Sequence, residues 1–373
     1  MKLSLNQGKL LLLGVFCWAL LCGCGSDEPN STASSAIEES PRQPITLTLA
    51  MTWPTNYPIF SDSVKQLSNS VATMSRGELR IEIDSANKHK APLGVLDMVK
   101  AGQYDMGHTA SYYWKGKDIS TMFFTTMPFG MTAPEQYAWF YHGGGMELMQ
   151  QVYARHGVYS FPGGNTGVQM GGWFRDEIKT LDDLKGLKMR IPGFAGEVLA
   201  KLGVVVTNIA PGELYTALDR GTIDALEWVG PSLDFKMGFH KIAPYYYTGW
   251  HEPASELQFI INKEVFDGLP EHLQEILTTA MKAAASDMYA LSYHASAENW
   301  AVIRSEYPQV QVRTFSKEIM AAIRQANKSL LTATAAQDAQ FAEILASQNA
   351  YLEKARQWTM ISDFAYLESV SEE

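Results

Sequence analysis

One arginine in the middle of the chain stands where it could bind a carboxylate. Arg190 lies near the end of the strand-like run at 187–191, just before the loop residues Pro192 and Gly193. A planar guanidinium can hold a carboxylate through two parallel hydrogen bonds. The competing interpretation is that Arg190 lies on the surface and forms an ordinary ion pair with an acidic side chain. The sequence leaves both interpretations open, and the first predicts an anion-binding site.

Two glutamates stand in apolar surroundings that are unusual for a carboxylate. Glu227 interrupts a run that otherwise reads as buried, and Glu252 lies in the segment 249–253 beside aromatic and proline residues. A buried carboxylate without a partner is costly, so each needs a basic side chain or a metal ion. Together with the amide oxygen of Gln169 and backbone carbonyls, the two carboxylates would form an oxygen-rich shell suited to Na⁺ or Ca²⁺. Separate salt bridges to two basic residues are the competing interpretation.

Motifs for known enzyme chemistry are incomplete or missing. The segment His142-Gly143-Gly144-Gly145 is similar to the oxyanion segment of esterases, but the sequence has no G-x-S-x-G nucleophile elbow. The eight histidines form no H-E-x-x-H motif, and neither a Walker loop nor a G-x-G-x-x-G fingerprint occurs. The glycines are better explained as an interruption of a helix over 134–156. We therefore expect a binding protein and not an enzyme.

The first 44 residues have the composition of an export and anchoring segment. Basic residues precede an apolar run at 10–21, which is typical of a signal peptide and is short for a transmembrane helix. The run ends in Leu-Cys-Gly-Cys at 21–24, close to a bacterial lipobox, so we predict a lipoprotein signal peptide over 1–23 and lipidation of Cys24. An ordinary cleaved signal is the alternative. Residues 24–44, rich in Ser, Pro and acidic residues, predict a flexible tether.

Charge and cysteine content exclude several classes of partner and site. The net charge is −10, which disfavours nucleic acid because binding phosphates needs a basic face. A small anion can still bind, since one buried arginine supplies a local positive field. All three cysteines lie within the first 24 residues, so no cysteine-based metal site or nucleophile is expected in the body of the protein.

Strand patterns alternate with helix patterns from Ile45 to the C-terminus, which predicts an α/β architecture. About 330 residues exceed one typical domain, so we expect two lobes. The predicted strands are 45–50, 79–84, 104–107, 167–174, 187–191, 204–209, 224–229, 257–262 and 310–314, and the predicted helices are 59–75, 92–101, 134–156, 181–185, 194–202, 212–220, 270–304 and the region from 317 onward.

Four segments together resemble the solute receptors of TRAP (tripartite ATP-independent periplasmic) transporters, in particular the subgroup that binds 2-oxo acids or lactate. The resemblance extends from Ile45 to the C-terminus. The four segments are GVQMGGWF at 167–174, DLKGLKMRIPGFAGEVLAKLG at 183–203, PGELYTALDRGTIDALEWVGP at 211–231 and APYYYTGWHEP at 243–253.

The resemblance implies a two-lobe periplasmic binding protein with crossing hinge strands, a long hinge helix and C-terminal helices. We expect residues 45–160 with 222–256 to form the first lobe and 161–221 with 257–330 to form the second. Residues 331–373 would form C-terminal helices that could dimerise the protein by helix exchange.

The resemblance also implies a ligand site that contains a cation. Arg190 would clamp the carboxylate of a small monocarboxylate, such as pyruvate or lactate, and Na⁺ or Ca²⁺ would bind with the ligand. The implied partners are the membrane subunits of a TRAP transporter, and the implied location is the periplasm, with a lipid anchor in the membrane. The other ligand-binding residues would be Gln169, Tyr112, Tyr113, Asn165 and Trp228. The cation would be held by Gln169, Glu227, the Trp228 carbonyl and Glu252. Gln258 could take the place of Glu252 if the match to the family is shifted slightly.

Three rival functions remain compatible with the sequence. The same fold could bind a dicarboxylate through Arg190 without a metal. It could also report a ligand to a signalling partner, or act as a metal-dependent enzyme on the acid.

Overall fold

Two separate β-sheets organise residues 43–371, the part of the chain that this computed structural model describes. The predicted signal peptide over 1–23, the lipidation of Cys24 and all of the predicted tether except residues 43–44 lie outside the described residues. Within 43–371, no helix combines the length and the apolar character needed to cross a membrane.

The first sheet is mixed and has the strand order β2-β1-β3-β10-β4. β1 pairs in parallel with β2 and β3, and β10 is antiparallel to both β3 and β4. Helix α1 covers this sheet with an apolar face, because Phe60, Val64, Leu67 and Val71 recur at helical spacing and are buried. The strands are β1 (Ile45–Met51), β2 (Leu79–Asp84), β3 (Met106–Thr109), β4 (Val158–Asn165) and β10 (Glu256–Asn262), and α1 is Phe60–Met74.

The second sheet is built from shorter strands in the order β11-β9-β5-β8-β6-β7. β6 pairs in parallel with β7 and β8, whereas β5 is antiparallel to β8 and β9. The strands are β5 (Gly172–Phe174), β6 (Lys188–Arg190), β7 (Val205–Thr207), β8 (Ala225–Leu226), β9 (Tyr245–Tyr247) and β11 (Gln311–Arg313).

The chain passes between the sheets through two adjacent segments. One leads from β4 to β5 over 166–171, and the other returns from β9 to β10 over 248–255. They are joined by backbone hydrogen bonds from Thr166 N to Ser255 O (3.1 Å) and from Gln169 N to Glu252 O (2.9 Å). These two segments lie where the resemblance implied crossing hinge strands, but the structure assigns no strand within either of them.

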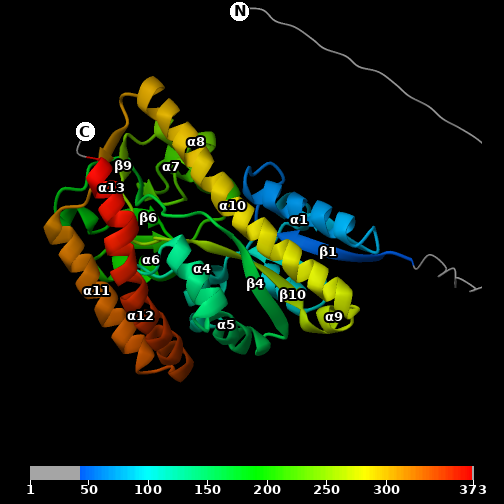
Figure 1. The fold of residues 1–373 in the computed structure, drawn as a ribbon. Coiled ribbons are helices and arrows are strands. Elements are labelled where there is room, and N and C mark those ends of the chain that lie inside the picture. The colour runs from blue at the N-terminus through cyan, green and yellow to red at the C-terminus, as the bar shows by residue number, and fades with distance from the viewer. Residues whose placement is uncertain (1–42, 372–373) are drawn as a thin grey trace, which may run out of the picture. The chain divides into compact units, whose positions relative to one another are not determined.

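One long helix, α10 (Glu271–Glu306), contacts strand β4 of the first sheet, helix α1 that covers that sheet, and helix α8 (Pro231–Met237), which follows β8 of the second sheet. Figure 1 shows it running past α1 and on to α8. It packs closely on β4, since a Cβ placed on Gly164 would lie 2.0 Å from the Sδ of Met288. The predicted long hinge helix is confirmed.

The remaining helices surround the sheets and form the C-terminal region (Figure 1). They include the predicted C-terminal helices; α11 packs on α6, and α12 packs on α4 and α5. The helices are α2 (Ala86–His89), α3 (Val95–Lys100), α4 (Ala133–His142), α5 (Gly145–Ala154), α6 (Gly193–Lys201), α7 (Leu214–Asp219), α9 (Lys263–Asp267), α11 (Lys317–Ala335), α12 (Ala339–Thr359) and α13 (Ala365–Val370), with 3₁₀ turns at Ser111–Trp114, Ile119–Phe124, Leu181–Leu184, Pro211–Glu213 and Phe239–Lys241 and a π-helical turn at Met360–Phe364.

The sheet topology corrects the predicted lobe boundaries. Residues 222–256 were expected in the first lobe, but they contain β8 and β9 of the second sheet. The segment 257–330 was expected in the second lobe, but it begins with β10 of the first sheet. The points at which the chain passes from one lobe to the other depend on which strands pair with each other. The prediction was wrong because hydrophobic periodicity does not reveal the order of strands in a sheet.

Local predictions also needed correction at several places; β9 and α8, for example, were not predicted as elements, whereas the interruption of 134–156 by glycines was predicted. The strand predicted at 167–174 is mostly the crossing segment, and a strand that was not predicted, β4, precedes it. The helix predicted over 134–156 is two helices, α4 and α5, separated at Gly143 and Gly144. Gly144 has φ of +86°, which L side chains rarely adopt, so this interruption by glycines is a structural feature of the helical pair.

Candidate functional site

Strand pairing places Arg190 beside Glu227. β6 ends at Arg190, and its parallel neighbour β8 ends one residue before Glu227. The Glu227 N–H donates to the Arg190 carbonyl at 2.9 Å. In α/β sheets, ligands bind beyond the carboxyl ends of the strands, and both side chains lie at that end.

The two crossing segments bring Gln169, His251 and Glu252 to the same place. The segments approach so closely that a Cβ placed on Gly249 would lie 1.8 Å from the Gln169 carbonyl oxygen. One ligand atom each from Glu227, His251 and Glu252 lie within 4.8 Å of one another. All four side chains are nearly or fully buried.

Arg190 is buried, but only one edge of its guanidinium is used. Its side chain is 1% exposed, and Nη1 donates to the Glu227 carbonyl (2.6 Å) and to Glu227 Oε2 (3.1 Å). Nε and Nη2 have no hydrogen-bond partner in the described part of the chain. Those two N–H groups form the edge that can hold a carboxylate at two points. A buried donor without a partner is costly, so this edge is suited to a ligand.

Three acceptor oxygens are also unpaired, two from the carboxylates of the cluster and one from Gln169, whose backbone bonds to that of Glu252. Among the described residues, Glu227 Oε1, Glu252 Oε2 and Gln169 Oε1 have no hydrogen-bond partner. The amide nitrogen of Gln169 donates to Thr166 Oγ1 at 2.8 Å, and this bond directs its oxygen. Carboxylate and amide oxygens are the donors that Na⁺ and Ca²⁺ accept. The residues present therefore fit a cation.

His251 belongs to the cluster and was missed as a candidate in the sequence. It is fully buried, neither ring nitrogen has a hydrogen-bond partner in residues 43–371, and Nε2 lies 3.5 Å from Glu227 Oε1. Burial lowers the pKa of His251 to about 4, so the imidazole is neutral at neutral pH. Its place directly before Glu252 was the available signal.

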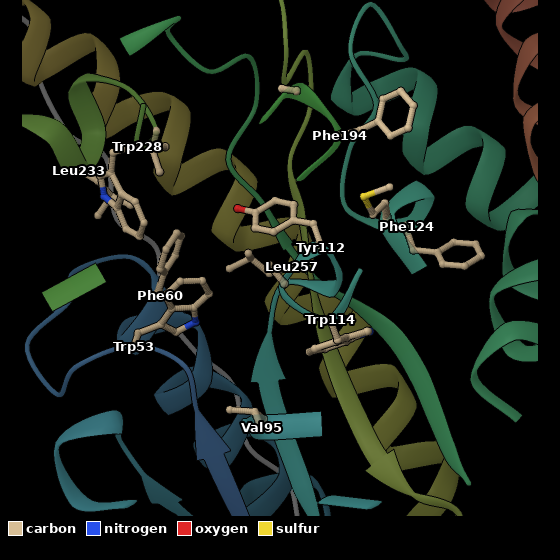
Figure 2. Packing of buried hydrophobic residues seen from close by; sticks show 14 of the residues in the cluster. Trp53, Phe60, Val95, Tyr112, Trp114, Phe124, Phe194, Trp228, Leu233 and Leu257 are labelled. Atoms are coloured by element: carbon tan, nitrogen blue, oxygen red, sulfur yellow. The ribbon is translucent and has the colours of Figure 1, made fainter. Parts of the chain in front are cut away.

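Aromatic side chains enclose the cluster. The Arg190 guanidinium carbon lies 5.1 Å from the centre of the Trp228 ring, within cation–π range. Tyr112 and Tyr113 pack edge to face, with ring centres 4.9 Å apart. Figure 2 shows the Tyr112 hydroxyl directed toward the side on which Trp228 and Phe60 lie. Tyr113 Oη and Trp228 Nε1 have no partner in the described residues, so they add two more open polar atoms.

Two residues named from the sequence have other partners. The Asn165 amide donates to Gln136 Oε1 (2.9 Å) and Glu256 Oε2 (3.0 Å), and its oxygen accepts from Gly167 N (2.8 Å). Asn165 therefore has no free amide atom, and we withdraw it as a ligand contact. Gln258 accepts a hydrogen bond from Tyr153 Oη at 2.8 Å, and it is Glu252 that joins the cluster with Glu227.

The electrostatics of the cluster favour a bound cation. Burial raises the pKa of both Glu227 and Glu252 to about 8. Burial, the largest single effect, lowers the pKa of Arg190, but the combined fields of Glu227, Tyr113, Tyr112 and Glu252 outweigh it, so the pKa of Arg190 is raised. With both carboxylates ionised, one guanidinium leaves an excess negative charge, and an anionic ligand would add another. A cation between the ligand and the carboxylates removes this repulsion.

Comparison with known proteins agrees with this fold. Residues 49–338 match the family model DctP, bacterial extracellular solute-binding protein, family 7. A monocarboxylate 2-oxoacid-binding periplasmic protein of Nostoc sp. (strain PCC 7120) is 40% identical over 319 residues, which are 85% of this chain and 87% of the relative.

Two crystal structures of TRAP periplasmic solute-binding proteins are similar throughout. One, from Colwellia psychrerythraea with bound calcium and pyruvate, has 63% identity and a TM-score of 0.87, over 88% of this chain and 100% of that one. The other, from Pseudoalteromonas atlantica T6c with bound sodium and pyruvate, has 64% identity and a TM-score of 0.87, over 88% and 99%. The predicted two-lobe α/β fold is confirmed, and the chain belongs to family 7 of the bacterial extracellular solute-binding proteins, the DctP family of TRAP solute receptors.

Proposed function

We propose that this protein captures a small 2-oxo or 2-hydroxy monocarboxylate, such as pyruvate or lactate, together with a cation, and delivers it to the membrane subunits of a TRAP transporter. The observation that supports this most is a single buried cluster with unpaired donors on Arg190 and unpaired acceptors on Glu227, Glu252 and Gln169. The donors suit an anion and the acceptors suit a cation, so the cluster is complementary to an ion pair.

The anion would bind to the free edge of Arg190. Nε and Nη2 present two parallel N–H groups, and Tyr113 Oη and Trp228 Nε1 offer further polar contacts. Nη1 is already anchored on Glu227, which holds the guanidinium plane in position. The second lobe thus supplies a pre-oriented clamp, and little side-chain entropy is lost on binding.

The cation would be held by Glu227, Glu252, Gln169 and the carbonyl of Trp228. When bound, it supplies positive charge next to the ligand carboxylate and the neighbouring 2-oxygen. The relatives from C. psychrerythraea and P. atlantica, which have calcium and sodium bound with pyruvate, support Ca²⁺ or Na⁺ as the ion. The charge of the cluster also counts against a metal-free dicarboxylate, because two more negative charges would be buried beside two carboxylates and one guanidinium.

Ligand capture would be coupled to closure of the two lobes. The site combines β6 and β8 of the second sheet with the crossing segments, and Tyr112 is in the turn that follows β3 of the first sheet. A Cβ on Gly193, at the start of α6, would lie 3.5 Å from the Tyr112 side chain, so the two lobes meet beside Arg190. A ligand that contacts both sides stabilises the closed state by its differential affinity for it.

A screen of small carboxylates tests the ligand class. Thermal shifts would be measured with pyruvate, lactate and succinate, each in sodium-free buffer, with Na⁺ and with Ca²⁺. We expect stabilisation by pyruvate or lactate that requires a cation. Stabilisation by succinate alone, independent of cations, would replace this function by that of a dicarboxylate receptor.

We further infer that the C-terminal helices form a homodimer and that Cys24 carries a lipid anchor. Large apolar side chains are unusually exposed on this tail: Trp358 (67%), Ile361 (74%), Tyr366 (66%) and Leu367 (61%). Exposed apolar clusters mark interaction surfaces. Light scattering of the wild type and of Ile361→Glu would test the dimer, because the glutamate charge should dissociate it.

Mass spectrometry of the membrane-extracted protein would test the acylation of Cys24.

A further inference from the structure

The environment of His251 differs from that of an oxygen-only cation site. Glu227, Glu252 and Gln169 offer oxygen atoms, whereas His251 adds an imidazole whose two nitrogens are unpaired among the described residues. It is fully buried, so water from the surface cannot satisfy the ring in this closed arrangement. A group of this kind, aimed at two carboxylates, calls for a partner inside the cluster.

The distances suit a metal ion better than a hydrogen bond. His251 Nε2 lies 3.5 Å from Glu227 Oε1, and the pair does not meet hydrogen-bond geometry. Two ligands that bind one tetrahedral Zn²⁺ at about 2.0–2.1 Å are about 3.4 Å apart. The third ligand atom, from Glu252, lies within 4.8 Å of both. Three donors from two strand-end loops thus surround one point.

The donor set decides which ions compete for that point. Oxygen-only shells select hard cations such as Ca²⁺, whereas one imidazole with two carboxylates is a set that Zn²⁺ and other first-row divalent ions accept readily. We propose that His251 is a nitrogen ligand that makes the cation site of this receptor able to bind Zn²⁺ more tightly than Ca²⁺. This rests on the proposed function, because it assigns a further ion to the same cation site.

His240 provides a matched control. It is also buried, at 2% exposure, and both of its ring nitrogens are unpaired in the described part of the chain. It stacks on Phe235 with ring centres 5.0 Å apart and meets Tyr307 edge to face at 4.2 Å. Among the described residues, the metal-ligating side chains that come together are those of Glu227, His251 and Glu252, and His240 is not one of them.

The test is metal binding by the full-length protein after chelator treatment. Zn²⁺ and Ca²⁺ would be titrated separately into the wild type, His251→Ala, His251→Gln and His240→Ala, with calorimetry and elemental analysis as readouts. We expect one Zn²⁺ per chain in the wild type and in His240→Ala. Zn²⁺ binding should be at least 10-fold weaker in both His251 variants, because losing one of three or four ligands costs more than about 1.4 kcal/mol, and the loss should be larger for Zn²⁺ than for Ca²⁺.

The outcomes separate this inference from the proposed function. Equal Zn²⁺ affinity in the wild type and both His251 variants would overturn the nitrogen ligand, and binding of Ca²⁺ and pyruvate by the wild type would still support the proposed function. Failure of the wild type to bind Ca²⁺, Na⁺ or pyruvate would instead remove the proposed function itself. His251→Gln retains a buried amide of similar size, so it answers the question if His251→Ala does not fold.

Discussion

Two buried carboxylate environments lie close together in this protein, and they differ in how many hydrogen-bond donors surround the carboxylate oxygens. Asp234 on α8 accepts four hydrogen bonds, from Trp173 Nε1 (2.9 Å), Tyr246 Oη (2.8 Å), Val229 N (3.1 Å) and Gly230 N (3.0 Å). Glu227 accepts one side-chain bond from Arg190 and keeps Oε1 open, and Glu252 keeps Oε2 open. Both environments exclude water, but only that of Asp234 is complete.

The difference separates a structural carboxylate from a binding one. Burial raises the pKa of Asp234 to about 6, with the four donors opposing the shift, whereas Glu227 and Glu252 reach about 8. Asp234 fixes the loop at 227–230, which carries Glu227 and Trp228, so the complete carboxylate positions the incomplete one. Unpaired atoms in a buried cluster therefore identify the site better than burial itself.

The arginines repeat this contrast and give the largest expected effect. Arg356 uses the Nε and Nη2 edge of its guanidinium on both oxygens of Glu135 and on the Gly130 carbonyl, whereas Arg190 leaves that edge free. Arg190→Gln should weaken pyruvate binding about 1000-fold, since removing one partner of a buried charged contact costs about 4 kcal/mol. Calorimetry with Ca²⁺ present measures this.

The control is Arg356→Gln. It should lower the melting temperature and leave pyruvate affinity within about 3-fold. Undiminished affinity in Arg190→Gln would remove that side chain from the site.

Removing the charge of Asp234 and removing that of Glu252 should have different effects on stability. Asp234→Ala strips four donors of their acceptor and should lower the free energy of unfolding by about 3 kcal/mol. Glu252→Gln removes a buried charge that has no full complement of partners, so stability should change by less than about 1 kcal/mol while Ca²⁺ affinity falls. Urea denaturation and calorimetry report the two quantities. A Glu252→Gln variant as unstable as Asp234→Ala, with normal Ca²⁺ affinity, would make Glu252 a structural residue.

The pH dependence of stability should reveal the open carboxylates. The folded-state pKa values of Glu227 and Glu252, about 8, lie above the unfolded value near 4.5. The folded protein therefore binds more protons than the unfolded chain between these values, and the contributed stability is lost as pH rises through about 8. We expect the cation-free protein to lose on the order of 1 kcal/mol per pH unit from pH 5 to 8.

Saturating Ca²⁺ should abolish most of that slope, because the cation competes with the protons. Thermal melts across this range, with and without Ca²⁺, measure it. An identical slope under both conditions would show that the titrating groups do not hold the ion.

A contact between the lobes should have the smallest effect. Lys115, which follows the turn at 111–114, bonds to the Gly193 carbonyl (3.3 Å) and to Glu197 on α6, whereas Lys117 pairs with Asp97 on α3, beside the first sheet. Lys115→Ala should speed pyruvate release about 2- to 5-fold, since exposed ion pairs contribute less than about 1 kcal/mol. Lys117→Ala should leave the rate unchanged. Stopped-flow tryptophan fluorescence measures both, and equal rates in the two variants would rule out Lys115 as a closing contact.

The sequence predicted much of the fold and the centre of the site. Arg190 ends one short strand and Glu227 follows its parallel neighbour, and the ends of parallel strands meet, so their proximity could be anticipated. Glu252 lies in one cluster with Glu227, and the backbone of Gln169 is hydrogen-bonded to that of Glu252, but the roles of these residues in ligand binding stay predictions.

The errors have a common cause in tertiary pairing. Asn165 looked free, but Glu256 and Gln136 occupy it, and those partners come from β10 and α4. The exchange of 222–256 and 257–330 between lobes likewise reflects strand order. No sequence motif marked His251 or Asp234. Their roles depend on whether the residues around them in the folded protein form hydrogen bonds with them, and a sequence pattern does not show this.

The linkage between anion and cation tests the central proposal most directly. Pyruvate would be titrated into metal-free protein in sodium-free buffer and into protein saturated with Ca²⁺, and Ca²⁺ would be titrated with and without pyruvate. Because both ions would share one buried cluster, each should tighten the binding of the other by the same factor, which we expect to be at least about 100-fold. Pyruvate affinity that is the same with and without the cation would show that the guanidinium and the carboxylates do not form a common site.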